Sequence, residues 1–382
     1  FFWFPKGEVN LGGDSSRLYF FKPLSWNSIS SYHVNPTSAI GVGNPAFYML
    51  PFLHFLNIIY TIADKNPYIL NATFSGFLLS SSFILIYLIL NELINKKVDS
   101  NPRVSFIFAG LFFTLSPLLT LEWHLALYFI SQIFSYPLIV YLFLKFLNKA
   151  GYKYIVIGVL CSFVFSTNFN YSVAPWFIAF FSSSVAFLLL YSLIQGKLRL
   201  FLRGFVLFWV LFLMIHLFHL LPELQVITDS TSSVSNVIFN NANTNNDALA
   251  YFHSIQPLVT LTYNLVGQLQ YGIIDGYGNP AKNIIYEYNA RLIPIYFIYF
   301  IIILLTILRR DKSVCAGGVR KTQLLLSIFL VLLFLMTANI TSSLLHLYEN
   351  MLSLPGFGMF RHYIGKFNMS FIFFYSLLLG LS

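Results

Sequence analysis

Residues 201–221 read FLRGFVLFWVLFLMIHLFHLL, and Arg203 is the one Lys, Arg, Asp or Glu among them. A helix that crosses the hydrocarbon core of a membrane needs about 20 mostly apolar residues, because its backbone rises about 1.5 Å per residue. This stretch has both the length and the composition. It therefore predicts a membrane-spanning helix.

Eight further stretches have the same apolar character: residues 68–91, 104–121, 125–147, 153–170, 172–193, 292–308, 322–344 and 367–382. Hydrophobic residues make up 57% of the 382-residue chain and charged residues 9%, whereas soluble domains carry about 25% charged residues. This composition excludes a soluble enzyme, a disordered chain and a disulfide scaffold, because a soluble fold must cover its exterior with polar groups. We expect an all-α fold: a polytopic transmembrane helical bundle with about nine spans and interfacial helices in its outer loops.

A tenth apolar run, residues 46–62, is interrupted by Pro51, His54 and Asn57. It is short and polar for a span, so we interpret it as an interfacial or re-entrant helix. If it spanned the membrane instead, residues 1–45 would lie on the inner side. The chain begins at Phe1 and ends inside an apolar run. We therefore expect it to be part of a longer protein, with a further helix before residue 1 and further domains or subunits.

The basic residues predict the orientation of the spans. Four short alternate loops hold 14 of the 22 Lys and Arg residues, and such loops favour the cytoplasmic side. Ten of the 13 acids and all eight His residues then fall on the outer side. The net charge of +9 thus reflects topology and predicts no nucleic-acid partner. We expect an integral cell-membrane protein with an extracytoplasmic active face.

The spans and loops divide the chain into four expected segments. Residues 1–67 form a first outer loop with interfacial helices, and residues 68–221 form a six-span block. Residues 222–291, rich in Asn, Ser and Thr, form a polar outer loop. Residues 292–382 form a three-span block with an outer loop at 345–366.

Three outer stretches contain candidate site residues. Residues 6–19 read KGEVNLGGDSSRLY, and the two glycines before Asp14 permit a tight turn at the membrane surface. Asp14 is interpreted either as the N-cap of a short helix or as a general base for a sugar hydroxyl. Residues 41–52, GVGNPAFYMLPF, predict a turn and a proline-kinked aromatic segment. Residues 354–367, LPGFGMFRHYIGKF, predict a compact loop before a span.

Together these stretches resemble the GT-C glycosyltransferases, in particular the mycobacterial-type arabinofuranosyltransferases and the YfhO-like membrane proteins. The resemblance rests on an Asp-containing first outer loop, a Tyr-x-x-Pro segment and a Pro…Phe-Arg…Lys-Phe loop. It implies transfer of a sugar from a polyprenyl-phosphate donor to a glycan, lipid or protein acceptor on the outer face. It also implies that Asp14, or Glu8 as second choice, is the catalytic base.

The phosphate of such a donor needs cationic ligands. Arg361 suits it best, because a guanidinium group donates two parallel hydrogen bonds to phosphate oxygens. His362, Lys366 and Arg17 are predicted to assist, and the alternative is that these cations contact lipid headgroups. The first loop has no Asp-x-Asp or Glu-x-Asp pair. We therefore expect no divalent metal and no cofactor, with the lipid-phosphate sugar acting as substrate.

Other polar residues leave alternatives open. Glu122 and His124 flank an interfacial Trp, and they form either a structural pair or part of the substrate cavity. His216 and His219 have a spacing that permits a metal pair, although a structural role is favoured. Two other functions compete with the enzyme: a non-catalytic membrane scaffold subunit with this fold, and a lipid or glycan transporter. The transporter needs polar groups inside the membrane, and the predicted spans contain few.

Overall fold

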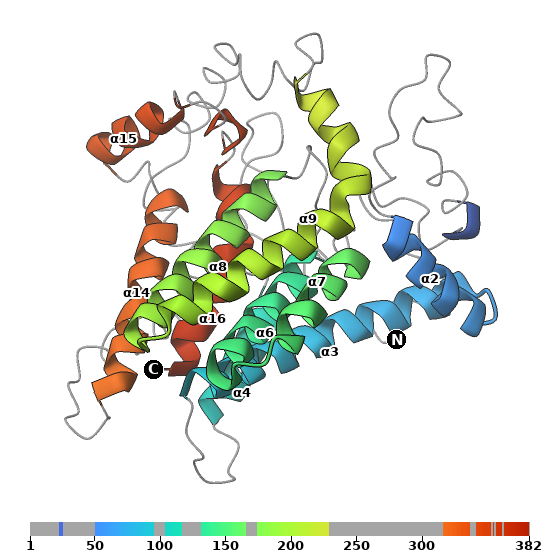
Figure 1. Ribbon diagram of the computed structural model, residues 1–382, viewed down its shortest axis with the longest axis horizontal. Coiled ribbons are helices and arrows are strands. Elements are labelled where there is room, and N and C mark those ends of the chain that lie inside the picture. Colours follow the sequence, from blue (N-terminus) through green and yellow to red (C-terminus); the bar gives the residue numbers. More distant parts are fainter. Residues whose placement is uncertain are drawn as a thin grey trace, which may run out of the picture. The chain divides into compact units, whose positions relative to one another are not determined.

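The computed structural model describes residues 23–25, 50–94, 104–116, 131–165, 174–228, 316–336, 341–352, 354, 357–360 and 363–381 (Figure 1). Within these ranges the chain is helical, with short turns and no strand. The helices are α2 Leu50–Ile62, α3 Pro67–Ile94, α4 Val104–Leu115, α6 Tyr136–Lys149, α7 Lys153–Phe165, α8 Ala174–Ile194, α9 Leu198–Thr228, α14 Ala316–Met336, α15 Ser342–Leu352 and α16 Tyr363–Leu381. A π-helical turn, η2, covers Ser131–Ser135, and a 3₁₀ turn, η5, covers Phe357–Phe360.

Two of the described helices are long and apolar enough to cross a membrane. They are α3, with a mean hydropathy of 2.0, and the part of α9 from Leu198 to Phe218, with a mean hydropathy of 2.2. Shorter apolar helices of 10–17 residues lie in α2, α4, α7, α8, α14 and α16. The helical fold class is therefore confirmed for the described residues, and the nine-span bundle stays a prediction. The expected span at 292–308 lies outside the described residues.

Contacts between helices divide the chain into two compact units. Unit 1 contains α2, α3, η2, α6, α7 and α9 as far as Leu224; unit 2 contains α4, α8 from Ile178 to Tyr191, α14, α15, η5 and α16. In unit 1, α6 packs against both α3 and α7, and α2 packs against α7 and α3. In unit 2, α16 packs against α14 and α4.

Local capping explains where several of these helices begin and end. The Asn66 side-chain oxygen accepts hydrogen bonds from the backbone N–H groups of Tyr68 and Ile69, at 3.0 and 3.2 Å, and so caps the start of α3 beside Pro67. Ala150, with φ of 53°, closes α6 through its N–H to the Phe146 carbonyl. Gly196, with φ of 68°, makes the turn between α8 and α9.

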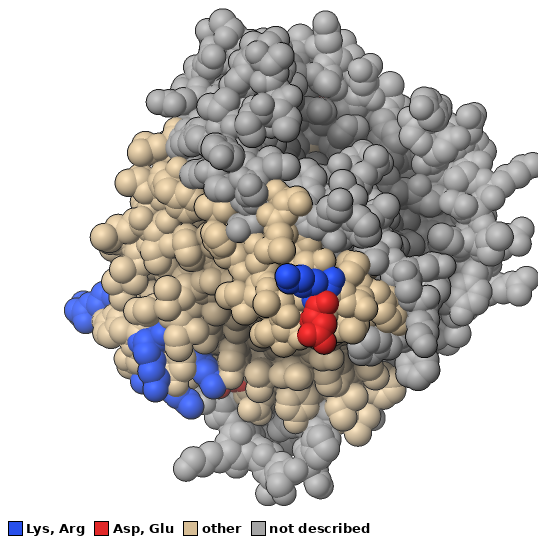
Figure 2. Space-filling view, turned by 90° about the vertical axis from the view of Figure 1, so that its right-hand side faces the viewer, with Lys and Arg blue, Asp and Glu red and all other residues tan. Residues whose placement is uncertain are grey.

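The N-terminal two thirds of α9 have two apolar faces with different surroundings. A stripe at four-residue spacing is buried in unit 1: Gly204, Phe208, Phe212 and His216. The opposite face exposes Leu202, Val206, Val210, Leu213, Leu217 and Leu221. In the view of Figure 2, the described charged side chains form small separate groups with a wide uncharged surface between them.

Candidate functional site

Most of the predicted site residues lie outside the described part of the chain. These residues are Glu8, Asp14, Arg17, Glu122, His124, Arg361 and His362. Lys366 lies in α16, but its side chain is outside the described set. Their roles and mutual distances therefore stay predictions. The structure instead describes the residues that hold the loop on either side of Arg361.

The segment before Arg361 is attached to α15 by a buried hydrogen bond. The Tyr348 O–H donates to the Phe360 carbonyl at 2.9 Å, and the Tyr348 side chain is fully buried. Phe360 is the last residue of η5 and the direct neighbour of Arg361. The bond therefore holds the backbone of Phe360, the residue before Arg361 in the sequence.

Aromatic rings support the same segment from two helices. The Phe357 ring lies 5.9 Å from the Tyr348 ring and 5.2 Å from the Phe360 ring. The Phe360 ring stacks on Phe367 of α16, with centroids 5.1 Å apart and planes 17° apart. Arg361 and His362 join η5 to the first residue of α16. The described residues on either side of this two-residue connection, Phe360 and Phe367, are thus held by ring contacts.

The exposed side of α15 has a hydrogen-bonded acid and base. His346 Nδ1 lies 2.8 Å from Glu349 Oε2, with His346 79% exposed and Glu349 23% exposed. The two residues are three positions apart and therefore lie on one helix face. Neither His346 nor Glu349 was predicted from the sequence as a site residue. Its signal was the i, i+3 spacing within residues 345–366, the predicted outer loop.

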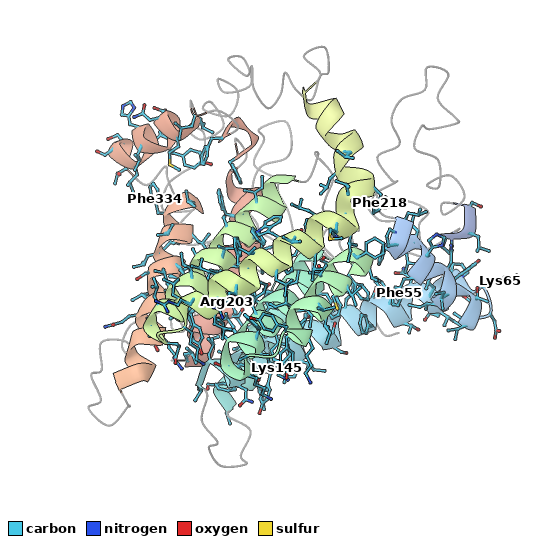
Figure 3. All side chains as sticks on the ribbon, in the orientation of Figure 1. Phe55, Lys65, Lys145, Arg203, Phe218 and Phe334 are labelled. Atoms are coloured by element: carbon cyan, nitrogen blue, oxygen red, sulfur yellow. The ribbon has the colours of Figure 1, made fainter. Side chains whose placement is uncertain are left out.

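Four edge-to-face rings connect different elements of unit 1. Phe77 of α3 contacts Phe134 of η2 at 5.3 Å, and Phe134 contacts Phe165 of α7 at 5.0 Å. Phe165 contacts Phe55 of α2 at 5.0 Å (Figure 3). η2 is a π-helical turn, and such turns often occur at functional sites. The sequence analysis missed this group, because hydropathy does not show which rings meet.

Two buried amides lie on α2 and α3, which contact each other. Among the described residues, Asn57 Oδ1 and Asn71 Nδ2 have no hydrogen-bond partner, while Asn71 Oδ1 accepts from the Ser75 O–H at 3.4 Å. A buried polar atom without a partner costs about 1–3 kcal/mol. Asn57 Oδ1 is an acceptor and Asn71 Nδ2 is a donor. Water and a ligand hydroxyl both suit such groups, because each can donate one hydrogen bond and accept another.

His216 makes a buried polar contact between α9 and α7. Its Nε2 lies 3.2 Å from Ser162 Oγ, while the Ser162 O–H donates to the Val159 carbonyl at 2.7 Å. Because that hydroxyl proton is already used, the contact favours the His216 tautomer with hydrogen on Nε2. The Phe212 ring lies 4.2 Å from the imidazole. His216 therefore has a described structural partner, and the side chain of His219 lies outside the described residues.

Among the described residues, no group of three or more His, Cys, Asp or Glu side chains has an arrangement that holds a metal ion. No protein-family model, no curated protein and no solved structure matches the chain.

Proposed function

We propose that the chain is a polytopic membrane protein that transfers a sugar from a polyprenyl-phosphate donor to an acceptor on the extracytoplasmic face. The membrane part is supported by the exposed apolar face of α9, which is as hydrophobic as its buried face. A helix that is apolar all round suits a protein core or a lipid environment. Lipid is the partner that fits a side-chain stripe exposed along several turns.

The observation that carries the transfer reaction is the anchored loop around Phe360. A phosphate-binding arginine works best on a backbone that is already in place, because the ligand then does not have to order it. The Tyr348–Phe360 hydrogen bond and the Phe360–Phe367 stack provide this support next to Arg361. Arg361 would bind the donor phosphate, with His362, Lys366 and Arg17 as further cations.

In the proposed reaction, Asp14 takes the proton from the acceptor hydroxyl. The acceptor oxygen forms a bond to the anomeric carbon of the sugar. The bond from that carbon to the phosphate oxygen breaks, and its electron pair stays on polyprenyl phosphate. Arg361 would stabilise the negative charge on this leaving group. Glu122 and His124 would line the acceptor side.

The test is sugar transfer by the purified full chain in lipid vesicles, with a radiolabelled polyprenyl-phosphate sugar and an alkyl glycoside acceptor. Asp14→Asn is expected to lower the transfer rate by about 10²- to 10⁴-fold, because a general base contributes that much. Asp64→Asn is the matched control. Asp64 lies exposed in the turn before α3, with φ of 50°, a conformation that Asn adopts readily.

Two results would overturn the proposal. Unchanged transfer by the Asp14→Asn variant would remove Asp14 from the reaction. A wild-type chain that binds the donor in vesicles and transfers no sugar would exclude the enzyme and favour a non-catalytic scaffold.

A further inference from the structure

Six basic residues gather in unit 1 at the end of α6 and the beginnings of α7 and α9. We call them the basic group: Lys145, Lys149, Lys153, Lys197, Arg199 and Arg203. Three contacts place these helix ends together. Lys197 Nζ donates to the Leu147 carbonyl at 2.7 Å, the Phe201 ring lies 6.5 Å from Phe143, and Gly204 lies against the Phe146 ring.

Tyrosine rings hold two of these cations near one point. Lys145, which Figure 3 labels, has its Nζ 4.8 Å from the centre of the Tyr141 ring and 5.9 Å from that of Tyr154. Lys153 Nζ lies 5.5 Å from the centre of the Tyr154 ring. The ammonium groups of Lys145 and Lys153 thus both lie within 5.9 Å of the centre of the same Tyr154 ring. Their mutual repulsion is relieved by an anion placed between them.

An acid among the described residues that interacts with this group also has a hydrogen-bond partner. Glu92 of α3 interacts electrostatically with Lys145. Its Oε2 accepts a hydrogen bond from Asn148 Nδ2 at 3.0 Å, and the same amide also donates to the Glu92 carbonyl. Among the described residues, Glu92 is the acid that these contacts link to the six basic residues, which leaves a positive excess. Lys149, Lys153, Arg199 and Arg203 are exposed, so this charge is accessible.

Exposed apolar residues follow the basic ones on both helices. On α7, Val156, Ile157 and Leu160 come within two turns after Lys153. On α9, Leu202, Val206 and Val210 follow Arg199 at helical spacing. A cationic end that continues into an exposed apolar face matches a molecule with an anionic head and hydrocarbon chains. We propose that the basic group binds the phosphate headgroup of an anionic glycerophospholipid, whose acyl chains lie along α7 and α9.

This inference rests on the membrane part of the proposed function and is independent of sugar transfer. The experiment is native mass spectrometry of the purified full chain in detergent, titrated with phosphatidylglycerol or with phosphatidylcholine. The wild-type chain is expected to prefer phosphatidylglycerol. The triple variant Lys149→Gln, Arg199→Gln, Arg203→Gln is expected to lose about 100-fold in affinity for phosphatidylglycerol, since three basic residues near an anionic lipid together contribute about 3 kcal/mol.

Matched variants separate charge from other effects. The double variant Arg199→Lys, Arg203→Lys keeps the charge and is expected to keep the preference. Lys65→Gln removes an exposed charge from the turn before α3 and is expected to change nothing. Should the triple variant fail to fold, the wild-type chain still gives a decisive result: its preference must fall when salt rises from about 0.05 to about 0.5 M.

Several outcomes would overturn the lipid site. They are equal affinity for the two lipids, a triple variant that keeps the preference, and a preference that is insensitive to salt. A polyprenyl phosphate titration tests the other source of a lipid phosphate. The triple variant is expected to bind polyprenyl phosphate as the wild-type chain does. If the triple variant lost this binding, the basic group would be assigned to polyprenyl phosphate instead.

Discussion

The helices α9 of unit 1 and α16 of unit 2 are similarly apolar in sequence but have opposite surroundings. In α16, every residue from Phe371 to Leu378 is buried, and its rings contact α4, α8 and α14. In α9, one stripe is buried while the opposite stripe of large apolar residues is exposed. Both helices are almost uncharged, but α16 is a central core element of unit 2, whereas α9 lies at the surface of unit 1.

The difference shows that hydropathy alone does not separate core from surface in this chain. In α9 the buried face is marked by a small residue and a polar one, Gly204 and His216, and not by greater hydrophobicity. This pattern is typical of helices in lipid, whose interfaces use close backbone approach and polar contacts. In α16, rings from α4, α8 and α14 contact a segment, residues 371–378, that is buried throughout. Changes to the two helices should therefore have different consequences.

The largest expected effect on the free energy of unfolding comes from a change in the core around α16. Phe373 is completely buried, and its ring lies 5.0 Å from Phe180 of α8 and 6.2 Å from Phe113 of α4. Phe373→Ala is expected to lower the free energy of unfolding by about 3–5 kcal/mol, because it leaves a cavity among rings. The measurement is unfolding of the purified chain in detergent micelles.

Leu217→Ala in α9 is the matched truncation, since Leu217 is 48% exposed. It is expected to change the free energy of unfolding by less than about 0.5 kcal/mol. Equal losses for the two variants would break the comparison. They would show that protein, and not lipid or detergent, covers the outer face of α9.

The next largest effect on the free energy of unfolding is expected where α9 closely approaches α6. A Cβ atom at Gly204 would overlap the buried Phe146 ring, so Gly204→Ala is expected to cost about 1–3 kcal/mol. Gly158 of α7 is the control, because its added Cβ would meet Leu142 at an ordinary 3.8 Å. Gly158→Ala should raise stability by up to about 1 kcal/mol through helix propensity. If both variants changed the free energy of unfolding in the same direction, the close packing of Gly204 against the Phe146 ring would be contradicted.

A smaller effect is expected where α9 meets α7 through polar atoms. Ser162→Ala leaves His216 Nε2, on a side chain that is 2% exposed, without this partner. The expected loss of unfolding free energy is about 1–2 kcal/mol. The loss should shrink in a His216→Phe background, where no polar atom needs Ser162. Additive effects in this double-mutant cycle would show that the contact does not stabilise unit 1.

Much of the helical layout follows from local sequence. The stretches at 68–91 and 172–193 correspond to α3 and α8, because Asn66 and Gly196 provide recognisable ends. The stretch at 104–121 is described only as far as Ser116: α4 ends at Leu115, and Ser116 precedes Pro117, which disfavours helix at that residue. The π-helical η2 carries no periodic signal that distinguishes it from the α-helix that follows.

The side-chain contacts that build the candidate sites were less predictable. Ser162 and His216 are 54 residues apart, and Phe77, Phe134 and Phe165 lie on three different elements. Such pairs depend on how helices pack, and periodicity in one segment does not contain that information. The anchoring of Phe360 by Tyr348 is more local, within the predicted outer loop 345–366.

The smallest expected effect on stability tests whether unit 2 also depends on a polar contact. Tyr348→Phe removes the hydrogen bond to the Phe360 carbonyl and keeps the ring contact with Phe357 at 5.9 Å. The expected cost is about 1 kcal/mol, while Tyr152→Phe in the exposed turn before α7 should cost nothing measurable. If this bond positions Arg361, the variant should also raise the donor concentration needed for half-maximal transfer, because the loop must then be ordered by the ligand. Unchanged stability together with an unchanged donor concentration for half-maximal transfer would show that ring packing alone holds the loop. Unit 2 would then differ from unit 1 in not depending on a polar contact, even at its predicted site.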